Sequence, residues 1–451
     1  MPPSGNEGGT QAPTRHPIPW RDAAFYDEAR LDAELRRVFD ICHGCRRCFN
    51  LCDSFPRLFD LIDAAASGEL DTVASAGFKP VVDACTLCDM CFMTKCPYVP
   101  PHEFNLDFPH LMLRARAVAA RQGKVPFADR ELAKTDRNGR LAARAAPLAN
   151  WASATGNRLT RPLLEKLAGV HREAELPRYH APTFQAQAAR ATPELDRTAP
   201  AFGRKAVLYA TCFVNYNEPA IGRAALAVLA RNGVATRVEH PACCGMPQLE
   251  QGDLDEVARR ARQVAAALLP LVDDGYTIVA LVPSCALMLK FEWPLILPED
   301  AGIRRLAAAT MDLSQYVVDI ARNEGLAPGM APLDAGVTLH LACHARAQNM
   351  GAKAAEMLRR IPEADVEVIE RCSGHGGSWG VKKDFFEVAM KVGKPVARQA
   401  AKEPGRYVAS ECPLAALHVA QGMRRLDSGA VPDARGLHPI VLMARAYGLD
   451  P

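Results

Sequence analysis

The segment KAVLYATC, residues 205–212, decides how the C-terminal half of this 451-residue chain folds, because it has a counterpart further on. GVTLHLAC, residues 336–343, repeats its pattern of an apolar, strand-like run that ends in a cysteine. Two more pairs follow in the same order: ATRVEHPACCG with DVEVIERCSG, and YTIVALVPSC with RYVASEC. The paired cysteines are 131, 129 and 127 residues apart: Cys212 and Cys343, Cys243 and Cys372, and Cys285 and Cys412. This near-constant spacing indicates an internal repeat.

Helical stretches such as AIGRAALAVLARNG separate the strand-like runs. Strands that alternate with helices predict parallel sheets built from βαβ units. The repeated cysteines then lie at the carboxyl ends of strands, where open α/β sheets place their sites. The sequence therefore predicts an α+β multidomain protein, with an all-α N-terminal part followed by two α/β domains related by the repeat.

Two dense cysteine runs lie in that N-terminal part: CHGCRRCFNLC at residues 42–52 and CTLCDMCFMTKCP at residues 85–97. Each begins C-x2-C-x2-C, and in two-cluster ferredoxins the fourth cysteine of each run binds the other cluster. We therefore expect two [4Fe-4S] clusters, one held by Cys42, Cys45, Cys48 and Cys96, the other by Cys85, Cys88, Cys91 and Cys52. Zinc is the alternative, but zinc sites use cysteines in pairs, which would leave one thiol of each triple unused.

The 32 residues between the two runs favour a helical ferredoxin domain over a compact β-rich one. The expected organisation is a flexible tail, a two-cluster ferredoxin domain, a helical connector and two α/β domains. Their expected bounds are 1–30, 31–115, 116–204, 205–328 and 329–451.

The repeat unit carries its own candidate ligands. The first copy offers Cys212, Cys243, Cys244 and Cys285, enough for a third cluster. The second offers only Cys343, Cys372 and Cys412, because Ser373 stands where the first copy has Cys244. His344 and His375 are candidate replacements, since histidine can bind iron in such clusters, although a hydrogen-bonded structural role is the favoured interpretation of both. The glycine-rich CSGHGGSWG lets the backbone approach a neighbour closely, but it lacks the dinucleotide-binding pattern.

Bulk composition excludes several classes of protein. The 54 basic and 51 acidic residues nearly balance and no long Lys/Arg run occurs, which argues against nucleic-acid binding. No stretch of eighteen apolar residues and no secretory signal are present, so we expect a cytoplasmic protein, at most peripheral to the membrane. The basic helical stretch at residues 111–122 could lie on anionic lipid, but a solvated helix face is favoured. Fifteen cysteines in a reducing compartment indicate metal or redox chemistry.

A resemblance to a known family is carried by four motifs: CCG at 243–245, PSCALMLK at 283–290, HLACHARAQNMG at 340–351 and ERCSGHGGSWGVKKDFF at 370–386. They resemble the CCG-domain iron–sulfur oxidoreductases, in particular the iron–sulfur protein of anaerobic glycerol-3-phosphate dehydrogenase, with heterodisulfide reductase and the iron–sulfur proteins of glycolate oxidase and lactate utilisation as further members. The resemblance implies a ferredoxin domain followed by tandem CCG domains. In heterodisulfide reductase the motif closes with C-x2-C, whereas Val282 and Ala409 occupy that position here, which argues against the same disulfide chemistry.

We therefore expect an electron-transfer protein or subunit without a substrate-oxidising site of its own. The resemblance implies a flavoprotein dehydrogenase or other redox protein as its partner, and a quinone or similar acceptor. One alternative is that the CCG portion itself reduces a disulfide or similar substrate at an iron–sulfur centre. Others are that the chain donates electrons for peroxide detoxification, or that its clusters only sense oxidants.

Overall fold

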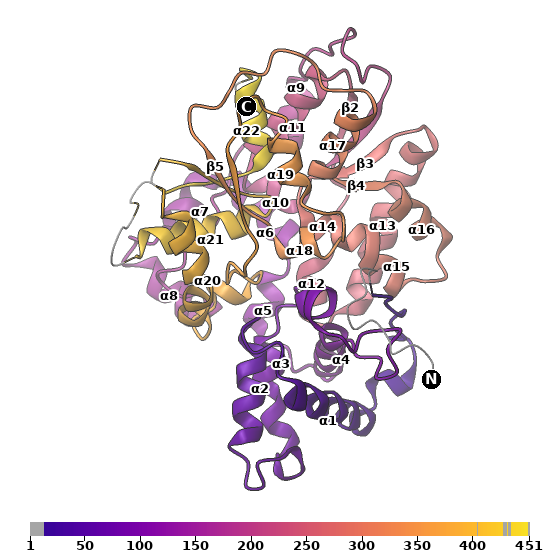
Figure 1. Cartoon of the computed structure of the whole chain (residues 1–451), viewed down its shortest axis with the longest axis vertical. Coiled ribbons are helices and arrows are strands. Elements are labelled where there is room, and N and C mark those ends of the chain that lie inside the picture. The colour runs from indigo at the N-terminus through magenta and orange to yellow at the C-terminus, as the bar shows by residue number, and fades with distance from the viewer. Residues whose placement is uncertain (1–12, 404, 427–430, 432–433, 450–451) are drawn as a thin grey trace.

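Two four-stranded parallel sheets organise the C-terminal part of the computed structural model, which describes residues 13–403, 405–426, 431 and 434–449 (Figure 1). The first sheet has the order β2-β1-β3-β4. Its strands are β1 (Lys205–Tyr209), β2 (Ala235–Glu239), β3 (Thr277–Ala280) and β4 (Thr310–Asp312). The central β1 is almost wholly buried, as expected for a strand covered on both faces.

The second sheet has the order β6-β5-β7-β8 and repeats the topology of the first. Its strands are β5 (Val337–His340), β6 (Val366–Ile369), β7 (Tyr407–Ser410) and β8 (Gly436–Leu437). The expected internal repeat and the parallel pairing are therefore confirmed. Each sheet also has a fourth strand, β4 or β8, which was not expected because two or three residues carry too little periodicity to be recognised.

Helices connect and cover these strands. In the first unit they are α10 (Cys212–Tyr216), α11 (Pro219–Arg231), α12 (Met246–Glu250), α13 (Leu254–Asp273), α14 (Pro283–Leu287), α15 (Trp293–Ile296), α16 (Ala301–Ala308) and α17 (Leu313–Asn323), with a π-helical turn at Met288–Glu292. In the second they are α18 (Cys343–Arg346), α19 (Lys353–Leu358), α20 (Phe386–Ala400), α21 (Pro413–Arg424) and α22 (Pro439–Ala446), with a 3-10 turn at Trp379–Val381.

The two α/β units exchange their last helices. α22, which ends the second unit, packs against α11 of the first, and α17, which ends the first unit, packs against α19 of the second. α22 has two buried sides: Ile440 and Met443 belong to the core shared with the first sheet, whereas Leu442 belongs to the core of the second. Each unit therefore completes the packing of the other.

The chain before the sheets is helical, and its first helices form the lower part of Figure 1. They are α1 (Glu28–Cys45), α2 (Ser54–Asp63), α3 (Lys79–Ala84) and α4 (Phe108–Arg121), with short 3-10 turns at Ala23–Tyr26, Leu70–Thr72 and Ser75–Phe78 and a π-helical turn at Cys91–Lys95. In the segment expected to be a loose tail, the described residues from 13 onward include the buried side chains of Ile18, Trp20 and Phe25. α4, considered above for lipid contact, buries an apolar face that includes Leu111, Met112 and Val118.

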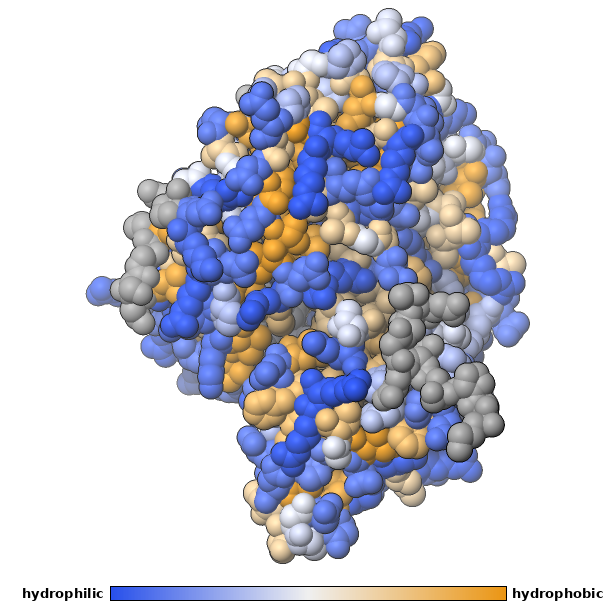
Figure 2. All heavy atoms as spheres, in the orientation of Figure 1, coloured by the Kyte–Doolittle hydropathy of each residue, from blue (hydrophilic) through white to orange (hydrophobic). Residues whose placement is uncertain are grey.

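The segment that follows α4 is also helical, with α5 (Phe127–Leu132), α6 (Thr135–Arg144), α7 (Ala146–Ser153), α8 (Thr160–Ala168) and α9 (Phe184–Arg190). α7 packs against α6 and α8, and α5 packs against α8. Hydrophilic side chains cover much of the face seen in Figure 2, and no helix in the described ranges is long and apolar enough to cross a membrane.

Candidate metal centres

The first cysteine run begins inside a helix. Cys42 and Cys45 lie on the last turns of α1, and the chain leaves the helix at Arg46, whose φ of 53° is left-handed. Burial raises the pKa of the Cys42 thiol, and the nearby thiols of Cys96, Cys48 and Cys45 raise it further. The structure thus brings Cys96, from the second run, beside the first three cysteines of the first run.

The fourth cysteine of the first run is in turn close to the second run. Burial raises the pKa of the Cys52 thiol, and the nearby thiols of Cys88 and Cys85 raise it further. Burial likewise raises the pKa of Cys91, with Cys88, Cys85, Cys52 and Cys48 as further causes. The crossed grouping expected from the sequence is compatible with these neighbours, and Cys48 and Cys91 connect the two groups.

The loop of the second run is held in an unusual conformation by buried charges. Leu87 and Asp89 have φ values of 49° and 63°, a region that is costly for residues other than glycine. Arg15 binds Asp89 at 2.8 Å, Asp107 at 2.7 Å and Glu292 of the first α/β unit at 3.3 Å. The sequence offered no signal for this network, because its members are up to 277 residues apart.

In the first α/β unit four cysteines meet beyond the carboxyl ends of β1, β2 and β3. The Sγ atoms of Cys212 and Cys243 are 3.8 Å apart. Hydrogen bonds from Cys212 and Cys244 lower the pKa of the Cys243 thiol, and Cys244 also interacts with Cys285. Thr211, which precedes Cys212, has a φ of 56°, so strained backbone positions the first of these thiols.

In the second α/β unit three cysteines occupy the corresponding strand ends. Burial raises the pKa of the Cys343 thiol, and the nearby thiols of Cys88, Cys372 and Cys412 raise it further. Cys343, Cys372 and Cys412 are therefore brought together, and Cys88 of the N-terminal part lies beside them. Ser373 is buried at the position that Cys244 holds in the first unit.

The donor set of these groups is thiolate, the ligand type that iron–sulfur clusters use. Within the described ranges, no three or more His, Cys, Asp or Glu side chains are arranged to hold one metal ion. A cubane sets a different requirement, because each of its thiolates binds a separate iron. The two N-terminal groups and the group of the first α/β unit each supply four thiols of the required type.

The comparison with protein families matches both α/β units. The model of the CCG family, described as a cysteine-rich domain, matches residues 206–290 and 337–419. The chain belongs to the CCG cysteine-rich domain family. Each matched range contains three strands of one sheet together with the cysteines at their ends, so the two units are hereafter called the first and second CCG domains.

Three relatives illustrate the range of proteins that resemble this chain. The C component of anaerobic glycerol-3-phosphate dehydrogenase from Escherichia coli (strain K12) is 27% identical over 324 residues, which are 70% of this chain and 76% of the relative. The B component of fumarate reductase (CoM/CoB) from Methanothermobacter marburgensis is 28% identical over 254 residues, 55% of this chain and 47% of the relative. Lactate utilization protein A of Geobacillus kaustophilus is 31% identical over 190 residues, 40% of this chain and 75% of the relative.

The two candidate histidines of the second CCG domain differ in their surroundings. The Nδ1 atom of His344 lies 2.8 Å from the Ser284 hydroxyl, and its Nε2 atom lies 3.3 Å from the Leu87 carbonyl oxygen. Both ring nitrogens of His344 are thus occupied, as the structural interpretation requires. The Nε2 atom of His375 is buried without a hydrogen-bond partner in the described part of the chain. Burial lowers the pKa of His375 to about 3, with His418 and His344 as further causes.

The glycine-rich loop is packed against other parts of the same chain. A Cβ atom at Gly376 would lie 2.5 Å from Thr86 in the second cysteine run, and one at Gly377 would lie 2.3 Å from Glu250 in the first CCG domain. Both glycines have positive φ values. The close approach expected from the sequence is therefore made to neighbouring side chains at the junction of the cysteine run and the two CCG domains.

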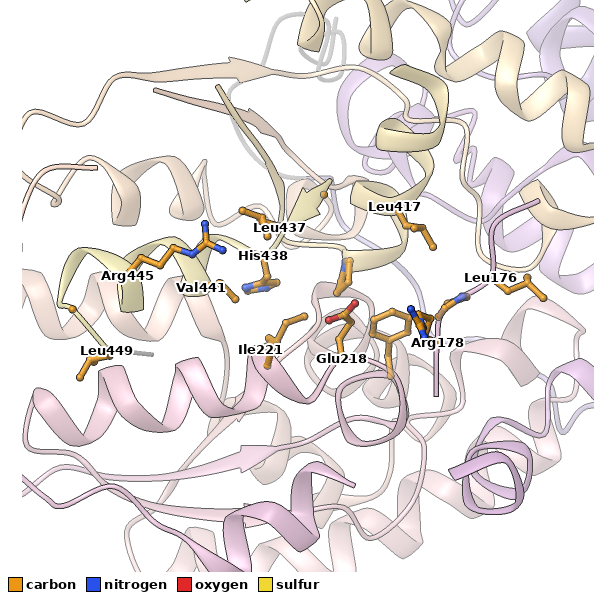
Figure 3. A pocket seen from close by; sticks show the side chains of 16 residues that line it. Leu176, Arg178, Glu218, Ile221, Leu417, Leu437, His438, Val441, Arg445 and Leu449 are labelled. Carbon is orange, nitrogen blue, oxygen red and sulfur yellow. The ribbon is translucent and has the colours of Figure 1, made fainter. Parts of the chain in front are cut away.

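A cavity of about 600 Å³ lies between the two CCG domains and the connector (Figure 3). Phe213 and Pro413, which follow Cys212 and Cys412 in sequence, belong to its wall. The side chains around it are mainly apolar, with a few charged groups: Leu176, Arg178, Glu218, Ile221, Leu417, Leu437, His438, Val441, Arg445 and Leu449. Partial desolvation raises the pKa of Glu218, whose side chain is still exposed, and Arg223 opposes that rise. Only the tertiary structure brings these segments together.

Proposed function

We propose that this chain is an iron–sulfur electron-transfer subunit that accepts electrons from a partner flavoprotein dehydrogenase and delivers them to a quinone. One observation carries the proposal: the cysteine groups follow one another through the molecule. Cys48 lies near Cys91, Cys88 lies near Cys343 and Cys372, and the Cys412 thiol is influenced by Cys285. Redox centres held by these groups would form one series from the N-terminal part to the first CCG domain.

The proposed ligands follow the neighbours of each thiol. Two [4Fe-4S] clusters would be held by the crossed N-terminal groups, and a third cluster by the four cysteines of the first CCG domain. When bound, such clusters supply one-electron carriers. The protein buries five of these twelve cysteines and partly buries the other seven. Arg47 and Lys95 act on the Cys48 thiol and lower its pKa against the larger effect of burial.

For the second CCG domain we propose His375 as the fourth ligand beside Cys343, Cys372 and Cys412. Its buried Nε2 atom has no partner in the described part of the chain, which is costly unless a ligand satisfies it. His375→Ala should then alter the electron paramagnetic resonance spectrum of the reduced protein, whereas His344→Ala should leave that spectrum unchanged. Equal spectra for His375→Ala and the wild type would remove this ligand from the proposal.

The cavity between the CCG domains is our candidate site for the acceptor. Its volume lies within the range of small-molecule sites, and its mostly apolar wall suits a quinone ring. Glu218, an exposed carboxyl in the cavity wall whose pKa is raised, is a candidate source of the proton that quinone reduction consumes. The partner dehydrogenase is inferred from the relatives, two of which are named as subunits of a dehydrogenase and of a reductase.

Iron and sulfide counts after anaerobic purification test the cofactors. About eight irons per chain would support the N-terminal pair alone, about twelve would add a cluster in one CCG domain, and about sixteen would add a cluster in each, since each cubane contains four irons. Four or fewer irons with bound zinc would refute the proposal.

Reoxidation of the reduced protein by a soluble quinone tests the acceptor site. Leu417→Trp would fill part of the cavity and should slow reoxidation by quinone at least about tenfold, a change equivalent to 1.4 kcal/mol. Phe202→Trp is the control, because Phe202 is 52% exposed and lies outside the cavity wall. Reoxidation at the wild-type rate by Leu417→Trp, with unchanged cluster content, would exclude this cavity.

A further inference from the structure

The connector carries an unusual concentration of exposed apolar side chains. Eleven large hydrophobic side chains are exposed in the described part of the chain, and seven of them lie between residues 127 and 167. The seven are Phe127, Leu141, Leu148, Trp151, Leu159, Leu163 and Leu167. Single exposed apolar residues need no explanation, but a concentration on a few adjoining helices marks a surface that contacts something apolar.

The amphipathic pattern of α8 is inverted. The one buried residue in this fully described helix is Arg161, which is 1% exposed. Its guanidinium donates to the carbonyl oxygens of Arg172, His171 and Ala174. Leu163 and Leu167, spaced one helical turn apart, are on the exposed side, with Leu167 67% exposed. The helix is therefore held to the protein through a charged group while Leu163 and Leu167 face outward.

α7 and α8 form a hairpin that carries five of these residues. The Thr160 hydroxyl donates to the Ala152 carbonyl at 2.6 Å, and Asn157 donates to the Trp151 carbonyl at 3.0 Å. α7 adds Leu148 and Trp151 to the exposed apolar set, and the turn before α8 adds Leu159, which is 80% exposed. We call Leu148, Trp151, Leu159, Leu163 and Leu167 the hairpin surface.

The hairpin is also fixed to the second CCG domain. His171 N–H donates to the Val381 carbonyl at 2.8 Å, and Lys383 N–H donates to the Gly169 carbonyl at 2.8 Å. Anything that the hairpin surface contacts is therefore held at a defined position relative to the CCG portion. The connector continues from the hairpin to Leu176 and Arg178 in the wall of the cavity.

The charges around this surface are basic. Arg140, Arg144, Arg158 and Lys166 are exposed and form no ion pair within the described residues. Glu165, the acidic residue of α8, is neutralised by Arg172. Leucines and a tryptophan flanked by uncompensated Lys and Arg are typical of helices that lie in the interface of an anionic membrane. Protein interfaces instead favour several aromatic residues and a core depleted of charge.

We infer that the hairpin surface docks this chain onto an anionic lipid membrane, with the leucines and Trp151 entering the headgroup region and the basic residues binding lipid phosphates. This docking does not depend on electron transfer, because it requires neither a bound cluster nor a redox partner. Docking would bring Leu176 and Arg178, the part of the connector that lines the cavity, toward the lipid bilayer, in which an apolar acceptor dissolves.

Sedimentation of the full chain with lipid vesicles tests the inference. Wild-type protein should bind vesicles of phosphatidylglycerol and phosphatidylethanolamine at least about tenfold more tightly than vesicles of phosphatidylcholine. The double variant Leu163→Glu, Leu167→Glu should lose at least about tenfold of the affinity for anionic vesicles, because both carboxylates would have to enter the interface. Phe202→Glu is the matched control, because Phe202 is 52% exposed but outside the connector helices.

The charge contribution is tested separately. Arg158→Gln and Lys166→Gln should each weaken binding to anionic vesicles by roughly fivefold at low salt and by less at high salt. The inference would be overturned if the wild-type protein did not bind anionic vesicles. It would also be overturned if the double leucine variant bound them as tightly as the wild type while circular dichroism showed it to be folded. Loss of binding to the partner dehydrogenase by the double variant, without vesicle binding by the wild type, would assign the surface to a protein instead.

Discussion

Glu250 shows how a single carboxyl group is affected by its place between three parts of the chain. Burial raises its pKa to about 7 from an ordinary 4.5, while Arg116 of α4, Lys382 of the second CCG domain and the Ser378 N–H oppose that rise. Cys243 is a further cause that raises the pKa. The folded protein therefore binds this proton more tightly than the unfolded chain does.

Replacing Glu250 by glutamine should change how stability depends on pH. The stability contributed by the raised pKa is complete below pH 4.5 and is lost as the pH rises to about 7, with an upper bound of about 3 kcal/mol. The Glu250→Gln variant does not lose this stability as the pH rises. Its melting temperature minus that of the wild type should therefore increase from pH 5 to pH 8. A difference in melting temperature that stays constant over that range would contradict the assignment.

Alanine substitutions at Gly374 and Gly351 would distinguish the cost of backbone strain from the cost of a steric clash. Both have positive φ values, 80° and 75°, so alanine is strained at either position. A Cβ at Gly374 would lie 2.1 Å from the Ala389 carbonyl oxygen, whereas one at Gly351 would meet nothing within 4 Å. Gly351→Ala should cost about 1 to 2 kcal/mol from strain alone. Gly374→Ala should cost at least about 2 kcal/mol more in thermal unfolding, and equal costs would show that the loop can move aside.

At the scale of elements, a short π-helical turn explains the unusual spacing of the second cysteine run. The run has four residues between Cys91 and Cys96, one more than the bacterial ferredoxin pattern. Residues Cys91–Lys95 form a π-helical turn in which the Cys96 N–H donates to the Cys91 carbonyl at 2.9 Å. A π-turn accommodates one extra residue without extending the loop, so Cys96 still reaches the neighbourhood of Cys42.

Single serine variants test the crossed ligand assignment. If Cys52 belongs with the second run, the electron paramagnetic resonance spectrum of reduced Cys52→Ser should change in the same way as that of Cys88→Ser. Cys45→Ser should instead perturb the other cluster and give a different spectrum. A Cys52→Ser spectrum that matches Cys45→Ser would mean that each run holds its own cluster.

At the scale of the whole molecule, the exchanged helices make the two CCG domains interdependent. Ile440 of α22 is buried in the core shared with the first sheet, and Leu442 of the same helix is buried in the core of the second. Either residue replaced by alanine should cost about 2 to 5 kcal/mol, as is typical of a large-to-small change in a core.

Hydrogen exchange should distinguish the loss of packing in the first CCG domain from the loss of packing in the second. Ile440→Ala should raise amide exchange mainly in α11 of the first CCG domain, and Leu442→Ala should raise it mainly in β5 and β7 of the second, because lost packing opens the adjoining unit first. Exchange that increases only in the second domain for both variants would show that α22 does not stabilise its neighbour.

The sequence by itself determined the repeated α/β architecture and the grouping of cysteines by strand, because strand periodicity and cysteine spacing are local properties of the chain. It also indicated which residue type was missing in the second copy, at Ser373. Only the tertiary structure showed that Cys88 adjoins Cys343, that Arg15 joins Asp89 to Glu292, and that Leu163 and Leu167 of α8 face outward. These features depend on contacts between segments far apart in sequence, and no local pattern encodes which distant side chain fills a given space.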